Sequence, residues 1–330
     1  MRHEAFWLTA NDATQLYVNH WSSEGQPKAI VMIAHGMAEH SQRYTRFAHS
    51  LAEQGVSVFA LDQRGHGHTA TVGTLGYFAD KQGWDLVVSD LSCLNHHIRI
   101  HYPNTPIFLL GHSMGSYVAL AYLMQHSCSM QGAILSGSNY FKTSLRYRVA
   151  MAIARFERWR LGAKGRSKLL DIVVFYPYQR AVKSRRTNWD WLSRDSEQVD
   201  AYINDPLCGF TCTTQLWLDL LSGLQHVTPV RNMVQIDNYL PLLIIGGDAD
   251  PINHGHRLVE LADALRQSGN RAVDVHIYPD ARHEVLQEIN HGEVTADIIQ
   301  WLDAALVSQR EITSPTAASF DLETPHDTKH

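Results

Sequence analysis

A serine held between two glycines directly follows an apolar run in the first half of the chain. The segment Gly111-His112-Ser113-Met114-Gly115 comes after the apolar residues 107–110 and before a helix-like segment at 116–123. In a sharp strand-to-helix turn, glycines avoid collisions with the neighbouring elements, so a serine hydroxyl can be exposed in a strained conformation. A chain of this composition contains about 0.1 such motifs by chance. The surrounding pattern must therefore decide between a nucleophile and a helix-capping serine.

A serine hydroxyl is too weakly acidic to attack a carbonyl alone. An imidazole must take its proton, and a carboxylate must orient the imidazole and stabilise its charged form. Asp250 and His283 follow two later apolar segments, residues 240–245 and 273–277. The order Ser113, Asp250, His283 is that of an α/β-hydrolase. We expect Ser113 to be the nucleophile and His283 the base.

Three aspartates could serve as the acid. Asp250 is preferred because Pro251 fixes a turn after it, whereas Asp248 lies nearer the strand end and is suited to capping the loop. Asp280 is a third candidate, but it is too close to His283 in the chain to orient the imidazole ring easily.

The loop after residues 29–34 provides a candidate oxyanion hole. His35-Gly36-Met37 stands there, and this fold uses one backbone N–H from that loop and one from the residue after the nucleophile. The expected donors are the amides of Met37 and Met114. A sharp loop with a hydrogen-bonded histidine is the structural alternative, and the two interpretations are compatible.

Strand-like and helix-like segments alternate along the chain, which is typical of a parallel sheet whose active groups lie at the carboxyl ends of its strands. We expect an α/β-hydrolase fold, a mostly parallel sheet flanked by helices, with an inserted and largely helical cap. The expected core is 1–137 and 239–307, the cap is 138–238, and the polar tail 308–330 is predicted to be disordered. Helices are expected at 44–54, 84–101, 145–161, 256–267 and 294–307.

Three segments together resemble the monoacylglycerol lipase and lysophospholipase family of α/β-hydrolases, which is serine aminopeptidase-like. They are HGMAEHSQRY at 35–44, DQRGHGHT at 62–69 and the GHSMG motif. Asn204-Asp205-Pro206-Leu207 is similar to a cap segment of that family, and the resemblance covers about residues 5–305. It implies hydrolysis of a monoacyl lipid ester, with Ser113, Asp250 and His283 matching the triad. Ser116 and Met37 depart from the family pattern, which leaves the shape of the acyl pocket open.

Other functions fit parts of the same pattern. A general carboxylesterase or a serine aminopeptidase is the rival within the class, and a non-catalytic, ligand-binding relative is the alternative outside it. Arg64, Gly65 and Gly67 are expected to fix their loop rather than to do chemistry. Twenty histidines invite a metal, but their loop spacing lacks a ligand pattern, so we expect no metal and no cofactor.

Composition places the protein among globular chains. It has 330 residues, 45% of them hydrophobic, and a formal net charge of −5. The first residues lack the pattern of a secretory signal, and no run of eighteen apolar residues exists. We therefore expect a cytoplasmic protein with four reduced cysteines and no nucleic-acid partner. The oligomeric state is left open.

The predicted cap contains a basic segment at 142–186. It has thirteen Lys and Arg residues against only Glu157 and Asp171. A helix at 145–161 would place its apolar residues on one face, with Arg155 turned away. This pattern is typical of a surface that contacts an anionic membrane at its inner face. It equally fits a helix whose apolar face covers the core while its arginines are solvated.

Overall fold

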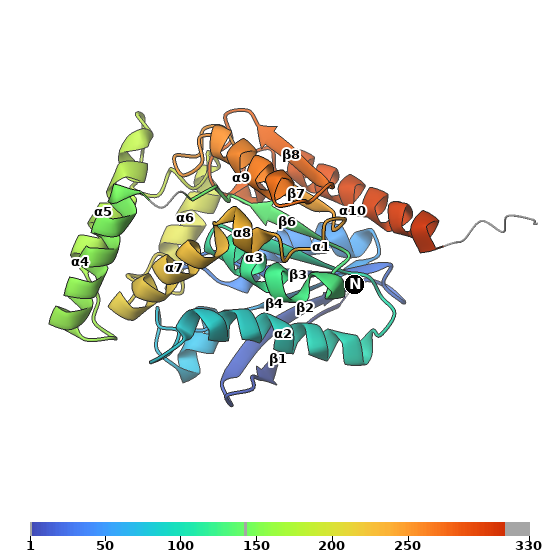
Figure 1. Cartoon of the computed structure of the whole chain (residues 1–330), viewed down its shortest axis with the longest axis horizontal. Helices are drawn as coiled ribbons and strands as arrows, with labels where there is room; N and C mark the ends of the chain where they lie inside the picture. The colour runs from blue at the N-terminus through green and yellow to red at the C-terminus, as the bar shows by residue number, and fades with distance from the viewer. Residues whose placement is uncertain (1, 142–143, 314–330) are drawn as a thin grey trace, which may run out of the picture.

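One eight-stranded sheet runs through the centre of the molecule (Figure 1). The computed structural model describes residues 2–141 and 144–313. The strand order is β1-β2-β4-β3-β5-β6-β7-β8; β1 and β2 are antiparallel to their neighbours, and the other strands are parallel. The bounds are β1 Arg2–Thr9, β2 Gln15–Ser22, β3 Ala29–Ala34, β4 Val56–Leu61, β5 Ile107–His112, β6 Gly132–Ser136, β7 Leu242–Gly247 and β8 Val273–Tyr278.

Helices cover both faces of the sheet, which is why strands β3 to β7 are buried along their whole length. One face packs against α2, α3 and α9, and the other packs against α1 and α10. The bounds are α1 Thr45–Glu53, α2 Gly83–His101, α3 Met114–His126, α9 His256–Gln267 and α10 His291–Thr313, with short 3₁₀ helices at Ser41–Tyr44, Gly67–Val72, Ser127–Ser129 and Val285–Gln287. The expected α/β-hydrolase architecture is therefore present.

Five further helices lie between β6 and β7, inside the segment predicted as a cap. They are α4 Leu145–Leu161, α5 Lys168–Ala181, α6 Ser196–Asn204, α7 Thr214–Val227 and α8 Val230–Met233. Figure 1 shows α4 and α5 at one end of the molecule, with α6 and α7 between them and the sheet. The chain thus leaves the sheet after β6, forms these five helices and returns to the sheet at β7.

The orientation of α4 differs from the expectation that its apolar face covers the core. Its buried side includes Tyr147, Met151, Ala154 and Glu157, while Leu145 is 74% exposed and Trp159 is 80% exposed. Of the apolar face identified from the sequence, Ile153 packs against the core, but most of that face is exposed. Periodicity located that face correctly but could not show which side of the helix packs.

The last described helix extends past the expected start of the tail, and parts of two predicted segments lie outside the described residues. Helix α10 continues to Thr313, past the expected start of the tail at 308, and residues 314–330 of that predicted tail lie outside the described residues. Lys142 of the basic segment also lies outside them. Among the described helices, none is both long and apolar enough to cross a membrane.

Candidate active site

Ser113 occupies a strained turn between β5 and α3. Its backbone has φ 50° and ψ −118°, and its N–H donates to Ser136 O at 2.9 Å. The flanking glycines allow the turn to pack closely. A Cβ on Gly115 would lie 2.0 Å from Ala34 O, and one on Gly111 would lie 2.4 Å from Gly115 O. The turn therefore holds the serine at the carboxyl end of the central strand.

Asp250 is the one of the three candidate acids that contacts His283. His283 Nδ1 lies 2.8 Å from Asp250 Oδ2, and Asp250 is fully buried. Asp250 also accepts hydrogen bonds from Ile252 N at 2.8 Å and Asn253 Nδ2 at 2.5 Å. Asp248 is exposed and accepts from the backbone N–H of Asp280 at 2.7 Å. This hydrogen bond links the loop after β7, which carries Asp248, to the loop after β8, which carries Asp280.

The ring of His283 is enclosed by two other rings. Trp191 lies 5.2 Å away and His112 lies 4.9 Å away, measured between centroids. Burial opposes protonation of His283, but the Asp250 carboxylate raises the pKa of the imidazole. Burial and the neighbouring His283 lower the pKa of His112 to about 4. His112 is therefore neutral at pH 7.

Ser113 and His283 line one cavity. Within the described residues no hydrogen bond joins Ser113 Oγ to His283 Nε2, a looseness common before a substrate tightens the site. Because Asp250 engages Nδ1, the nitrogen left for the serine proton is Nε2.

Met37 and Met114 line the same cavity. Met114 is the first residue of α3, so its N–H precedes the helical hydrogen-bond ladder. The N–H of Met37 has no acceptor among the described residues. The loop that carries Met37 is held by the inserted helices, because Ala38 O accepts hydrogen bonds from Tyr202 Oη at 3.0 Å and Gly209 N at 2.9 Å. Both residues expected to supply the oxyanion-hole amides thus line the cavity that Ser113 lines.

The cavity has a volume of about 1180 Å³ and is bounded by the core on one side and the inserted helices on the other. This is larger than the pockets that usually hold drug-sized molecules. Most of its wall is apolar or aromatic, and helices α4, α5 and α7 contribute part of it, including Val149, Val174, Phe175, Trp217, Leu220 and Leu224. A long apolar group therefore fits beside the serine.

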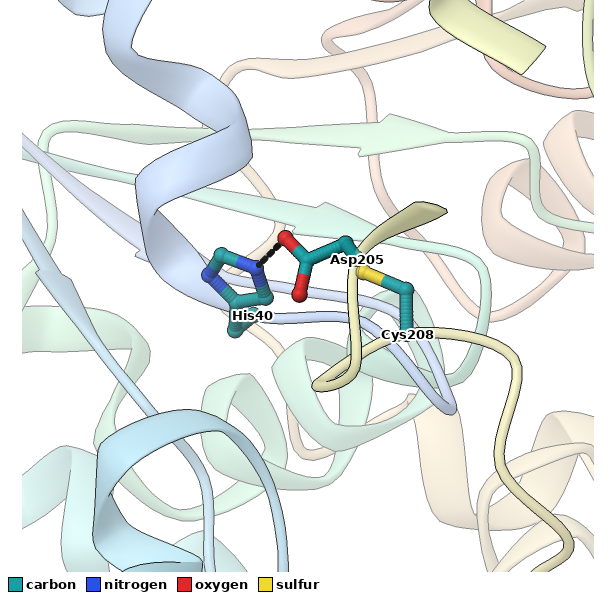
Figure 2. Close-up of side chains that lie close together, drawn as sticks. All are labelled: His40, Asp205 and Cys208. Atoms are coloured by element: carbon teal, nitrogen blue, oxygen red, sulfur yellow. Dashed lines mark hydrogen bonds and ion pairs between the residues drawn. The ribbon is translucent and has the colours of Figure 1, made fainter. Parts of the chain in front are cut away.

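Two clusters each bring together three potential metal ligands. Within each cluster the ligand atoms lie within 4.8 Å of one another. Figure 2 shows the first, where His40 Nε2 already contacts Asp205 Oδ2 at 2.8 Å beside Cys208. Burial raises the pKa of the Cys208 thiol, which disfavours the thiolate that a metal needs. In the second, Glu39, His112 and Glu284, both carboxylates are engaged by an arginine. Neither donor set suits a cation, because each is paired with protein groups.

The Arg64 loop has a structural role, as expected. Arg64 donates to Asp90 at 2.6 and 2.7 Å and to Asp12 at 2.6 and 2.9 Å. A Cβ on Gly65 would meet the backbone of Tyr77 at 2.5 Å. These contacts join the loop to α2 and to the β1–β2 turn, so the loop is fixed from both sides.

The sequence reasoning missed the ion-pair network of Glu39, Arg43 and Glu284. Its first two members stand in the HGMAEHSQRY segment, four residues apart, and the third follows His283 directly. The adjacency of Glu284 to the expected base was the available signal.

Comparison with known proteins assigns the chain to a family. Human monoglyceride lipase is 27% identical over 325 residues, which cover 94% of this chain and 92% of the human protein. A monoacylglycerol lipase of Mycolicibacterium smegmatis is 28% identical over 86% of this chain and 90% of its own. A thermostable carboxyl esterase from Bacillus coagulans, solved with glycerol, superposes with a TM-score of 0.85 at 25% identity and covers 93% of this chain and 99% of its own.

The family model described as serine aminopeptidase, S33, matches residues 25–290 and so includes β3, the strained serine, Asp250 and His283. It spans most of the chain. The protein therefore belongs to the serine aminopeptidase S33 family and has the α/β-hydrolase fold.

Proposed function

We propose that this protein is a serine hydrolase that cleaves the carboxylic ester of a monoacyl lipid, a monoacylglycerol or a lysophospholipid, through an acyl-enzyme. The observation that carries the proposal is the cavity that both Ser113 and the Asp250-bound His283 line and whose wall is mostly apolar. The names of the human, mycobacterial and Bacillus relatives support the same reaction class. We further propose residues 138–238 as a cap over this cavity.

In the proposed mechanism, His283 Nε2 takes the proton of Ser113 as the hydroxyl oxygen attacks the ester carbonyl. The carbonyl oxygen becomes an oxyanion, which the N–H groups of Met37 and Met114 stabilise. The tetrahedral intermediate collapses, the alcohol leaves with the proton from His283, and the acyl group stays on Ser113. A water molecule, deprotonated by His283, then attacks the acyl-enzyme, and release of the fatty acid restores Ser113. Asp250 holds the imidazole and balances its charge throughout.

A fluorophosphonate probe tests the nucleophile. Wild-type protein is expected to be labelled, and Ser113→Ala is expected to lose the label while keeping its melting temperature. Absence of wild-type labelling would instead favour a non-catalytic, ligand-binding relative. Undiminished labelling of Ser113→Ala would show that another residue is the nucleophile.

A substrate panel tests the lipid. Monoacylglycerols and lysophospholipids are expected to be hydrolysed with higher kcat/KM than short p-nitrophenyl esters, because a long chain can fill the apolar cavity. Faster turnover of short esters would favour a general carboxylesterase. Faster turnover of aminoacyl p-nitroanilides would favour a serine aminopeptidase.

We also propose that the cap contacts anionic membranes peripherally. Large apolar side chains are exposed along its two outer helices: Phe156 and Trp159 on α4, and Leu169, Ile172 and Tyr176 on α5. Exposed cations, Arg148 and Arg155 among them, lie on the same helix α4. Apolar side chains beside cations suit a negatively charged lipid surface.

Vesicle sedimentation tests this contact. Wild type is expected to sediment with phosphatidylglycerol vesicles at low salt, less at high salt, and not with phosphatidylcholine vesicles. Trp159→Ser is expected to weaken the binding, whereas Ile100→Ser, which changes an exposed apolar residue of α2 (64% exposed), is the matched control. Equal sedimentation with both lipids, or with neither, would contradict the proposal.

A further inference from the structure

A buried cluster of three charged side chains lies directly behind the proposed catalytic groups. Arg43 Nη1 lies 2.7 Å from Glu39 Oε2 and 2.6 Å from Glu284 Oε1, and Arg43 Nη2 lies 2.7 Å from Glu284 Oε2. The side chains of Arg43, Glu39 and Glu284 are only 10%, 4% and 6% exposed. One guanidinium therefore bridges two carboxylates that come from opposite ends of the chain.

The first carboxylate supports the loop of the proposed oxyanion hole. Glu39 Oε1 accepts a hydrogen bond from Gly36 N at 2.5 Å and another from Tyr44 Oη at 3.0 Å. Gly36 immediately precedes Met37, whose amide we assign to the oxyanion. A Cβ on Gly36 would lie 2.7 Å from Glu39 Oε1 and 3.4 Å from Ser113 Cβ. The Glu39 carboxylate therefore sets the path of the backbone that aims this amide.

The second carboxylate belongs to the residue after the proposed base. The backbone N–H of Glu284 donates to Leu192 O at 2.8 Å, while its side chain is held by Arg43. Gln287 Nε2 donates back to Arg43 O at 2.8 Å, so the contact is made twice. Any displacement of Arg43 would therefore also displace the loop that carries His283.

We propose that Arg43 is a positioning residue that ties the loop of Met37 to the loop of His283, so that the oxyanion donor and the base keep one geometry relative to Ser113. This inference rests on the proposed function. A guanidinium suits the task because its planar donors meet Glu284 at two atoms and Glu39 at a third oxygen, whereas a lysine ammonium is a single point charge. Misplacement of a catalytic group by about 1 Å can cost about 100-fold in rate.

The charge state of the cluster agrees with the geometry. Burial opposes ionisation of Glu39, but Arg43 and its neighbours lower the pKa of that carboxyl to about 2. Glu284 is one of the charges that raise the pKa of His283. Burial opposes the charge of Arg43, but Glu284 and Glu39 raise its pKa, so Arg43 and Glu39 stay ionised through the assay range.

Arg43→Lys and Glu284→Gln test the proposal, with Arg46→Lys as the matched control. Arg46 lies one helical turn along and donates to Leu286 O at 3.2 Å and Gln287 Oε1 at 3.3 Å, so it contacts the same loop without touching Glu284. Both test variants keep a polar group of similar size, which favours folding. Activity is measured on a p-nitrophenyl ester over a range of pH, together with the melting temperature and the rate of fluorophosphonate labelling.

Arg43→Lys is expected to lower kcat and the labelling rate about 10- to 100-fold with KM changed less than about threefold. Glu284→Gln is expected to lower kcat in the same way and to move the acid limb of the pH profile to lower pH. Arg46→Lys should resemble wild type. The inference is overturned if Arg43→Lys loses no more activity than Arg46→Lys, or if only KM or melting temperature changes. Failure of the proposed function is a separate result, because wild type itself would then remain unlabelled.

Discussion

His40 in the core donates a hydrogen bond to Asp205 in the inserted helices, with 2.8 Å between Nε2 and Oδ2 (Figure 2). Burial opposes ionisation of Asp205, but the bond from His40 lowers the pKa of that carboxyl. His40 follows the loop of the proposed oxyanion hole, and Asp205 comes directly after α6. The pair therefore fastens the proposed cap to the loop beside Ser113.

Breaking this pair should loosen the cap. Asp205→Ala leaves His40 buried with neither ring nitrogen paired, because His40 Nδ1 already has no partner within the described residues. We expect a loss of about 1–3 kcal/mol in the free energy of unfolding, and faster proteolysis between 138 and 238. Urea unfolding and limited proteolysis measure the two effects. Unchanged cleavage rates would show that other contacts hold the cap.

The choice between the two aspartates after β7 is directly testable. Asp250→Asn keeps the shape of the side chain but favours the wrong tautomer of His283, and we expect kcat to fall about 10⁴-fold. Asp248→Asn is the matched control, because among the described residues the Asp248 side chain hydrogen-bonds only to the backbone N–H of Asp280. It should keep most of the activity. Equal losses in the two variants would refute the assignment of Asp250.

The activity should be lost as the pH decreases, with an apparent pKa above that of an ordinary histidine. His283 must be neutral to accept the proton of Ser113, and its pKa is raised above 6.5 by Asp250. Activity is therefore present above the folded pKa and is lost as the pH decreases through it. The pH dependence of kcat/KM measures this limb, and an apparent pKa below 6.5 would contradict the raised pKa.

Arg64 should matter for stability rather than for catalysis. Arg64→Met removes the two Arg64 nitrogens that donate to the Asp90 carboxylate, which is 1% exposed. We expect a loss of about 3–5 kcal/mol in the free energy of unfolding. Burial already raises the pKa of Asp90 to about 6, although Arg64 opposes the shift. Without Arg64 the folded pKa rises further, so the folded state binds more protons than the unfolded state and the variant loses stability as the pH increases from 6 to 8. Adding Asp90→Asn should recover part of the loss. Urea unfolding at the two pH values checks both effects.

Local patterns were sufficient for much of the fold and for the candidate site. The expected helices at 145–161 and 256–267 match α4 and α9, and a glycine marks one end of each, Gly162 after α4 and Gly255 before α9. The strand-end positions of Ser113, Asp250 and His283 follow from the parallel sheet, since its active groups gather at one edge. Strand β1 was not predicted, because this edge strand is mostly exposed and mixes polar with apolar residues.

Contacts between distant parts of the chain could not be predicted. Arg43 and Glu284 are 241 residues apart, and neither periodicity nor spacing pairs them. The exposure of the apolar face of α4 could not be predicted for the same reason. A helix pattern defines an apolar side, but only the tertiary structure shows what that side contacts. The sequence was therefore enough to propose the reacting groups, but not to predict the ion-pair network of Glu39, Arg43 and Glu284 beside them.

The left-handed backbone of Ser113 means that the active turn reduces the stability of the protein that contains it. A non-glycine residue at φ 50° costs about 1–3 kcal/mol, which the close packing of Gly111 and Gly115 must offset. Ser113→Gly should relieve this strain, so the inactive protein should unfold at a higher temperature than the active one. Selection for stability alone would thus favour glycine at position 113, and the proposed function gives the reason for a serine there: its hydroxyl is the proposed nucleophile.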